Sequence, residues 1–484
     1  MKKKSLPIIL IICLILPVIF NSLYGCSPHY DIFNPPDFIP TKAPKDWLTI
    51  GPSTKSYKSI KSIALDKVPA THIDLPKNRI PDYIMPISDG GCLAVSQISL
   101  DDDEKTGVQL YSLQAIRFKA DGTVLWEKKY ESIIYQGYPK SMCVFPDDGF
   151  AVSMNVDIKN SGTYTTLDRL YRFSSNGTLL WEISDTVAAD VALDHLFAMK
   201  DGTLIAAGSV DLRNLDGSFR DNNIGLFHFE KDGTLSKQKV FGTQGNDNLI
   251  AASKAEASDI ILFWKSQSES GIDTGMESKL ECFNEDLDSR WVYKAGKNEN
   301  LFDVITLPDG KGALAFSSLI ESQNSNTGFS TVPMMLHFDN NGKKTWTYTA
   351  GVGQKAWMKT AAILKDGRIV AGWFNNVSSD LGQESNLELF SETGTLIDSI
   401  SKMPGVIQQI IPTKDGGFTV ISSQIVSGLP QPPYVSSIWQ DSEKIVAHYD
   451  KKLRITWQRS IDQYKHELRS DIVIPTADDR LLVG

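Results

Sequence analysis

Short apolar runs separated by Asp-Gly turns follow one another along most of the chain. One copy of this unit is LFAMKDGTLIAAGSV at residues 196–210, where a turn separates two apolar runs. Asp-Gly and Asn-Gly favour tight hairpin turns because glycine readily accepts a positive φ. The unit occurs eight times, so the sequence predicts eight β-hairpins of this first kind.

A second hairpin motif alternates with the first. It is an aromatic residue, Gly four residues later and Trp four residues after that, as in RFKADGTVLW at residues 117–126. The turn positions of its seven copies lie 52 to 59 residues apart. The aromatic is present in every copy, at Phe118, Phe173, Phe229, Phe283, Phe338, Phe390 and Tyr449. Leu287 and Leu453 replace the Gly in two copies.

Two hairpins in each repeat make four strands and leave no room for helices of ordinary length. Four-stranded units repeated around an axis are typical of a β-propeller, so we predict an all-β fold of this type. A linear β-solenoid is the alternative, although its coils are usually shorter. The repeated Phe and Trp are expected to fill the space between neighbouring blades.

The two hairpins occur in unequal numbers, eight of the first kind and seven of the second. We therefore predict eight blades, the last of which lacks its two outer strands. Residues 47–65 are expected to supply those strands and to close the ring by pairing the N- and C-terminal segments. A seven-bladed ring is the alternative.

The repeats resemble two groups of propellers. Gly177 with Trp181, and Gly342 with Trp346, are similar to the tryptophan-docking motif of pyrroloquinoline-quinone-like propellers. The repeat over residues 75–484 also resembles secreted and lipid-anchored bacterial propellers and the lipoprotein propeller of the outer-membrane barrel-assembly machinery. These resemblances imply the fold and a scaffold role. The quinoprotein motif has Asp where this chain has Phe or Tyr, so we expect no cofactor.

The N-terminus has the features of a bacterial lipoprotein precursor. Lys2, Lys3 and Lys4 precede an apolar run over residues 6–20 that is short for a membrane span. The stretch ending at Cys26 resembles a lipobox, which implies fatty acylation of this cysteine; an ordinary signal peptide is the alternative. We therefore expect a signal peptide at 1–25, a Pro-rich tether at 26–46 and one propeller domain at 47–484. Ser27 favours the outer membrane in a cell with two membranes, and otherwise the protein would lie on the outer face of the cytoplasmic membrane.

The composition mainly argues against two kinds of ligand, nucleic acid and metal ions. The chain has 49 Lys and Arg against 58 Asp and Glu, a net charge of −9, so a nucleic-acid partner is not expected. Cys92, Cys143 and Cys282 are expected to be small buried thiols, with a Cys92–Cys143 disulfide as the alternative. No Cys or His spacing indicates a metal, and His228, His337 and His448, at one repeat position in alternate blades, would lie too far apart to share an ion. Surface or inter-blade hydrogen bonds are expected for them.

The innermost strands carry the candidate ligand site, because propellers usually bind ligands around the axial channel. Counting eight residues back from each turn of the first kind gives a mostly polar ring: Asp82, Ser141, Asp194, Ala252, Phe302, Lys359, Gln408 and Asp471. Of these, Asp82, Asp194, Lys359, Gln408 and Asp471 are the candidate ligand residues at the channel mouth. Asp82 and Asp471 would become neighbours on closure, where a carboxylate pair can bind a cation or act as acid and base. Solvated polar residues at strand entries are the alternative.

These observations favour a non-enzymatic binding or scaffold protein, a monomeric ring held at the membrane by its lipid, with a protein or glycan partner. A channel-mouth enzyme of quinoprotein-like or lyase-like type is the alternative.

Replacing Cys26 by Ala is expected to leave an unlipidated precursor, because the acylated thiol is lost. Detergent phase partitioning of the expressed protein measures this. Unchanged partitioning of the variant into the detergent phase would contradict lipidation at Cys26.

Overall fold

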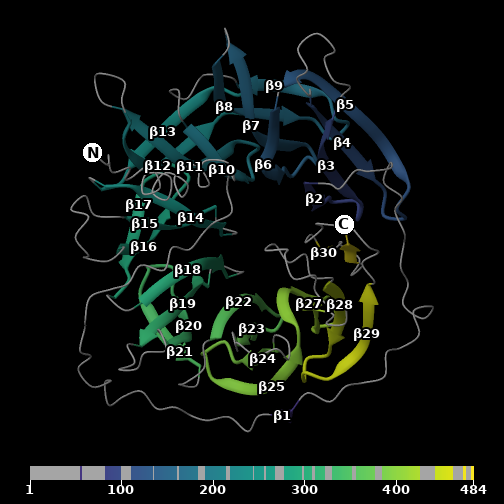
Figure 1. The fold of residues 1–484 in the computed structure, drawn as a ribbon, viewed down its shortest axis with the longest axis vertical. Helices are drawn as coiled ribbons and strands as arrows, with labels where there is room; N and C mark the ends of the chain where they lie inside the picture. Colours follow the sequence, from purple (N-terminus) through teal and green to yellow (C-terminus); the bar gives the residue numbers. More distant parts are fainter. Residues whose placement is uncertain are drawn as a thin grey trace, which may run out of the picture. The chain divides into compact units, whose positions relative to one another are not determined.

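The computed structural model describes eighteen stretches of the chain, and the account below refers to these residues. They are residues 55–56, 82–99, 111–134, 136–160, 163–183, 191–213, 219–243, 245–255, 258–266, 277–296, 299–307, 311–321, 330–350, 356–375, 384–425, 442–461, 473–475 and 481–483. All of them belong to one unit, Lys42–Gly484. The secondary structure they form consists of strands joined by turns (Figure 1).

Seven antiparallel sheets of four strands make up the fold, which confirms the predicted β-propeller. Within each sheet, or blade, the strands lie side by side in chain order. The strands of blades 1 to 4 are β2 (Tyr83–Pro86), β3 (Cys92–Ser99), β4 (Tyr111–Phe118) and β5 (Val124–Ile134); β6 (Gln136–Val144), β7 (Phe150–Asn160), β8 (Thr163–Phe173) and β9 (Leu179–Ile183); β10 (Val191–Ala198), β11 (Leu204–Arg213), β12 (Phe219–Phe229) and β13 (Leu235–Phe241); and β14 (Asp247–Lys254), β15 (Ile260–Ser266), β16 (Glu277–Phe283) and β17 (Ser289–Lys294).

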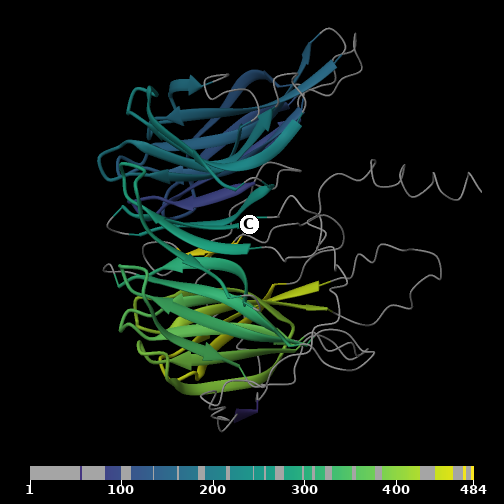
Figure 2. The same ribbon diagram turned by 90° about the vertical axis from the view of Figure 1, so that its left-hand side faces the viewer.

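The remaining three blades repeat this arrangement. Their strands are β18 (Glu299–Thr306), β19 (Ala313–Glu321), β20 (Ser330–Phe338) and β21 (Lys344–Thr349); β22 (Ala356–Ile363), β23 (Ile369–Asn375), β24 (Glu384–Phe390) and β25 (Leu396–Pro404); and β26 (Val406–Pro412), β27 (Phe418–Ile425), β28 (Ser442–Tyr449) and β29 (Ile455–Ile461). Each sheet is twisted, as Figure 2 shows from the side.

A two-stranded hairpin stands at the eighth position. Its strands are β30 (Val473–Pro475) and β31 (Leu481–Val483), and β30 contacts both β26 of blade 7 and β2 of blade 1. Each full blade contacts the next one along the chain, and this hairpin contacts both the last full blade and the first. The described chain therefore has seven full blades and the inner half of an eighth.

The predicted pairing of the N-terminal segment with this last hairpin is wrong for the residues that the structure describes. Strand β1 (Lys55–Ser56) pairs in parallel with β25, the outer strand of blade 6. The rest of the segment 47–65 lies outside the described residues. Any outer strand offers unpaired N–H and C=O groups to an extended segment, and a short alternating pattern does not specify which edge it joins.

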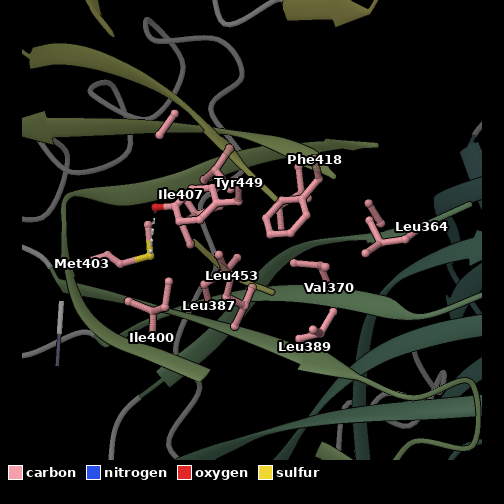
Figure 3. Packing of buried hydrophobic residues seen from close by; sticks show 14 residues of the cluster. Leu364, Val370, Leu387, Leu389, Ile400, Met403, Ile407, Phe418, Tyr449 and Leu453 are labelled. Carbon is pink, nitrogen blue, oxygen red and sulfur yellow. Dashed lines mark hydrogen bonds between the residues drawn. The ribbon is translucent and has the colours of Figure 1, made fainter. Parts of the chain in front are cut away.

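Apolar cores lie between successive blades, as predicted for the repeated aromatics. Figure 3 shows the core between blades 6 and 7, where Leu387 and Leu389 of β24 face Phe418 of β27 and Tyr449 of β28. Equivalent clusters join the other consecutive full blades. Phe338 is fully buried in the cluster between blades 4 and 5.

The Gly and Trp of the second motif meet at four of the six boundaries between full blades, those that precede blades 2, 3, 5 and 6. Trp126 of blade 1 lies against the outer turn of blade 2, where a Cβ added to Gly177 would come within 2.9 Å of the ring. Its indole N–H donates to the Ser175 carbonyl oxygen at 3.2 Å. Gly177 also has a φ of +74°, so both its backbone conformation and the closeness of the ring require glycine. The tryptophans are half-buried, including Trp346, which was expected to be buried.

The two copies without Gly follow the two copies without Trp. Lys237 stands at the Trp position of blade 3, and Leu287 stands at the Gly position of blade 4. There, Lys237 forms an ion pair with Asp286, so an electrostatic contact replaces the stacked one. In the same way Asp398 of blade 6 precedes Leu453 of blade 7. Both leucines adopt a positive φ, which keeps the turn geometry.

The three cysteines of the described residues are free and buried, which confirms the prediction of small buried thiols. Burial raises the pKa of each thiol to about 12. They are therefore protonated and unreactive at neutral pH.

One carboxyl group lies inside the boundary between blades 5 and 6. Glu388 on β24 is nearly fully buried, and this desolvation raises its pKa to about 7. Hydrogen bonding from the Tyr348 hydroxyl offsets this shift only in part. The boundary thus contains a group that titrates near neutral pH.

Replacing Phe338 by Ala is expected to lower the free energy of unfolding by about 3–5 kcal/mol, since a fully buried ring is removed from a packed core. Denaturant titration measures the change. Tyr138→Ala is the control, because this side chain is 53% exposed and should change stability by less than ~0.5 kcal/mol. Similar losses in both variants would contradict the inter-blade role.

Glu388 should make the protein less stable as pH rises. The folded state holds this proton more tightly than the unfolded state, so stability falls between the ordinary carboxyl pKa and about 7. From pH 5 to pH 8 the loss through this group is on the order of 3 kcal/mol. Glu388→Gln should remove that part of the slope in thermal melts; an unchanged slope would show that the carboxyl does not titrate in this range.

Candidate functional site

The innermost strand of each blade from 2 to 7 is interrupted by a β-bulge at one equivalent position. At that position one residue of the innermost strand has no partner in the second strand of the blade. In blade 1 the equivalent residue is Asp82, which directly precedes β2 and donates its N–H to the Val95 carbonyl oxygen. We call these residues the bulge ring: Asp82, Lys140, Asp194, Ile250, Phe302, Lys359 and Gln408. Bulges re-aim side chains and are frequent beside functional sites.

Most of the sequence-predicted site residues fall on this ring. The predicted positions Asp82, Asp194, Phe302, Lys359 and Gln408 belong to it. Ser141 lies one residue C-terminal to the ring residue Lys140, and Ala252 lies two residues C-terminal to the ring residue Ile250. The count assumed a Gly in each turn, but Asp148 and Ser258 hold the positive φ in blades 2 and 4. Apart from Asp82, which directly precedes β2, the ring residues lie within the strands rather than at strand entries; Asp194, for example, is the fourth of eight residues in β10.

A buried ion pair joins blades 2 and 3 at the ring. The ammonium of Lys140 lies 2.9 Å from Asp194 and 3.2 Å from Asp168, a residue of β8. Asp168 also accepts hydrogen bonds from the Leu193 N–H at 2.6 Å and from the Asn155 amide at 3.0 Å. Its side chain is 4% exposed, whereas that of Asp194 is 33% exposed. Asp168 therefore has a structural role, whereas the Asp194 carboxylate is accessible to solvent.

Tyr83 joins this cluster to blade 1. Its hydroxyl donates to the carbonyl oxygen of Lys140. Burial raises the pKa of Tyr83, and the charges of Asp82 and Asp194 raise it further. The structure thus brings the predicted residues Asp82 and Asp194 around one phenol.

Two further titratable groups adjoin this cluster: the carboxyl of Asp82, next to Tyr83, and the imidazole of His195, which feels the charge of Asp194. Partial desolvation raises the pKa of Asp82, although the Gln97 N–H donates to its carboxylate at 2.7 Å. Burial lowers the pKa of His195, so this ring is neutral near pH 7. Lys140 therefore supplies the positive charge of the cluster among the residues described.

The other predicted residues are not joined to this cluster by described contacts. Lys359 lies on β22 and Gln408 on β26, and these two strands contact each other. Asp471, and with it the predicted Asp82–Asp471 pair, lies outside the described residues. Between the two polar parts of the ring stand Ile250, which is 41% exposed, and the half-buried Phe302.

The cluster does not suit a metal ion or the quinone cofactor of the propellers that the repeats resemble. Among the described residues no three His, Cys, Asp or Glu side chains gather in a way that could hold a metal ion. An anionic quinone would meet the carboxylates of Asp82, Asp168 and Asp194 with one ammonium to balance them. The described residues therefore do not fit such a cofactor.

Of the predicted surface or inter-blade hydrogen bonds, His337 makes an exposed one, and those of His448 also stay within its own blade. His337 and His448 bond to Thr345 and Thr456 on the adjacent strand of the same blade, both at 2.5 Å. The His448 ring also stacks on Trp457 with centroids 5.7 Å apart. Side chains of one strand reach the next strand more readily than the next blade.

Sequence reasoning missed Tyr83, Lys140 and Asp168. Tyr83 and Lys140 adjoin predicted positions, so counting from the positive-φ residue of each turn would have found Lys140. Nothing local marks Asp168, which lies on the third strand and reaches Lys140 only through the folded sheet.

Comparison with known proteins adds the following. No protein-family model matches the chain, and no curated protein matches its sequence. Among solved structures it is similar to the β-propeller domain of the Trilobed protease from Pyrococcus furiosus, at 9% identity and a TM-score of 0.41, covering 81% of this chain and 98% of that one. It is also similar to the WD40 domain of Pan2 from Neurospora crassa, at 11% identity and a TM-score of 0.39, covering 70% and 85%. A protein of unknown function from Dyadobacter fermentans matches at 9% identity and a TM-score of 0.37, covering 66% and 97%.

The two carboxylates around Lys140 should respond differently to substitution. Asp168→Asn replaces a buried acceptor of three donors and should lower the free energy of unfolding by about 1–3 kcal/mol. Asp194→Asn weakens a partly solvated ion pair and should cost less than ~1 kcal/mol. Denaturant titration of both variants tests this assignment, and equal losses would contradict it.

Proposed function

We propose that this chain is a non-enzymatic binding protein of the bacterial cell envelope, which presents the bulge ring to a protein or glycan partner. The lipid on Cys26 would hold it at the membrane, the outer one where two are present. Cys26 lies outside the described residues, so this part rests on the sequence. Among the described residues, no helix has both the length and the apolar character to span a bilayer.

The observation that carries the proposal is the contrast between repeated and variable positions. Positions that join the blades recur, such as the seven aromatics and the five turn glycines. The bulge position is equally fixed in the backbone, yet its side chain differs from blade to blade and includes acidic, basic, amide and apolar groups. Packing between blades does not account for that variety, whereas contact with an asymmetric ligand does.

The protonation states at the ring favour binding over turnover. Although burial by itself lowers the pKa of Lys140, Asp168 and Asp194 raise it overall, so the ammonium keeps its proton. Tyr83 keeps its proton for the reasons given above. Neither group is poised near neutral pH as a general base. Resemblance to lipid-anchored bacterial propellers supports the same reading.

The test uses the full-length mature protein in detergent and two matched triple variants. The ring variant carries Asp194→Asn, Ile250→Ser and Gln408→Ala, all at half-buried or exposed positions. The control variant carries Glu285→Gln, Leu180→Ser and Lys129→Ala, which are exposed and lie away from the innermost strands. Each protein is applied to one array of bacterial surface glycans and one of random hexapeptides.

We expect the wild type and the control variant to bind the same array members and the ring variant to lose them, with Tm values within a few degrees. Binding that survives in the ring variant would place the site elsewhere. Unsaturated sugar ends released from a uronic-acid polysaccharide would instead support the lyase-like alternative.

A further inference from the structure

We infer that the ligand of the bulge ring is an extended peptide with a basic side chain and, nearby, an aliphatic one. The basic group would lie between Asp82 and Asp194, and the aliphatic group would cover Ile250. This inference rests on the proposed function and names the class of partner for the same site.

The charge of the cluster points to a cationic group. Two carboxylates, on Asp168 and Asp194, share the single ammonium of Lys140, and a third, on Asp82, acts on the adjacent Tyr83. That ammonium is already shared between Asp168 and Asp194, and the His195 ring is neutral. The cluster therefore keeps an excess of negative charge that a guanidinium or ammonium of a partner would balance.

The hydrogen bonds leave acceptors in place for such a group. The Gln97 N–H occupies Oδ2 of Asp82, and Lys140 occupies Oδ1 of Asp194. Within the described part of the chain, the second oxygen of each carboxylate has no partner. Asp82 is exposed and the Asp194 side chain is 33% exposed, so both oxygens are accessible from solvent. The charges of both carboxylates act on the Tyr83 phenol, so both lie near it.

An apolar part of the ring follows directly in chain order. Ile250 on β14 is 41% exposed at a position where the preceding two blades carry Lys140 and Asp194. Strand β14 contacts β11 and β12 of blade 3, so Ile250 lies on the blade next to that of Asp194. The half-buried Phe302 follows on β18, which contacts β14. When an apolar group of a partner covers a large exposed apolar side chain, apolar surface leaves water and the complex is stabilised.

The combination distinguishes a peptide from a glycan. Ile250, which is 41% exposed, offers no flat ring for a sugar to stack on, and the aromatic ring of Phe302 is only partly exposed. Most sugars also lack a cation to meet the carboxylates. A peptide supplies both groups on one backbone, a few residues apart.

The test is an array of hexapeptides in which Arg or Lys and Leu or Ile occupy every pair of positions in a Gly-Ser background. Matched sets replace the basic residue by Gln or Glu, or the aliphatic residue by Ser. The strongest binder is then titrated by fluorescence polarisation against full-length protein in detergent. Loss of either group should weaken binding about tenfold or more, and binding should weaken as ionic strength rises from ~0.05 to ~0.5 M.

Variants assign the effect to the ring. The double variant Asp82→Asn, Asp194→Asn should weaken binding of the basic peptide about tenfold. Ile250→Ser should weaken binding only of peptides that carry the aliphatic residue. Glu285→Gln, an exposed carboxylate on an outer turn, is the control and should change nothing.

The outcomes separate the two proposals. Ring-dependent binding of a glycan or of an acidic peptide would overturn this inference and leave the proposed function standing. Binding of basic peptides that ignores the ring substitutions would overturn the inference as well. If no glycan or peptide binds in a ring-dependent way, both proposals fail.

Discussion

Packing between blades is the interaction on which the rest of this structure depends. A four-stranded sheet of short strands has two faces to bury and too few residues to fold over itself, so each blade must use its neighbours as cover. The apolar clusters lie between successive sheets for this reason. Stacking of a tryptophan on the outer turn of the next blade extends the same contact to the outer strands.

This contact links substitutions that lie about 50 residues apart. A side chain on the turn would collide with the ring of the preceding Trp, so a turn can lose its Gly only where that Trp is absent. Leu287 and Leu453 satisfy this condition, since Lys237 and Asp398 precede them. The irregular copies of the repeat are therefore compensated pairs rather than decay of the motif.

The same constraint shows where function can reside. Side chains that fill a boundary are set by their neighbours, and their chemistry recurs. The bulge residues lie on the innermost strands and their chemistry differs from blade to blade, although Phe302 also packs against the core between blades 5 and 6. The scaffold can thus carry an asymmetric set of charged and apolar groups, with Asp82 and Asp194 in one part and Ile250 in another, without loss of its uniform cores.

The sequence by itself determined the strands, their order within a blade and the aromatic cores, because period-two alternation and turn glycines are local signals repeated seven times. It also located Asp82, Asp194, Lys359 and Gln408 on equivalent positions, since a fixed distance from each turn is again local. Tertiary structure alone decided two things. Lys140 meets Asp168 across three paired strands of blade 2 and meets Asp194 across a blade boundary, and β1 joins β25 rather than the last hairpin. Which charges meet and which open edge accepts a strand depend on distances in space, and alternation along the chain encodes only the face of a sheet on which a side chain lies.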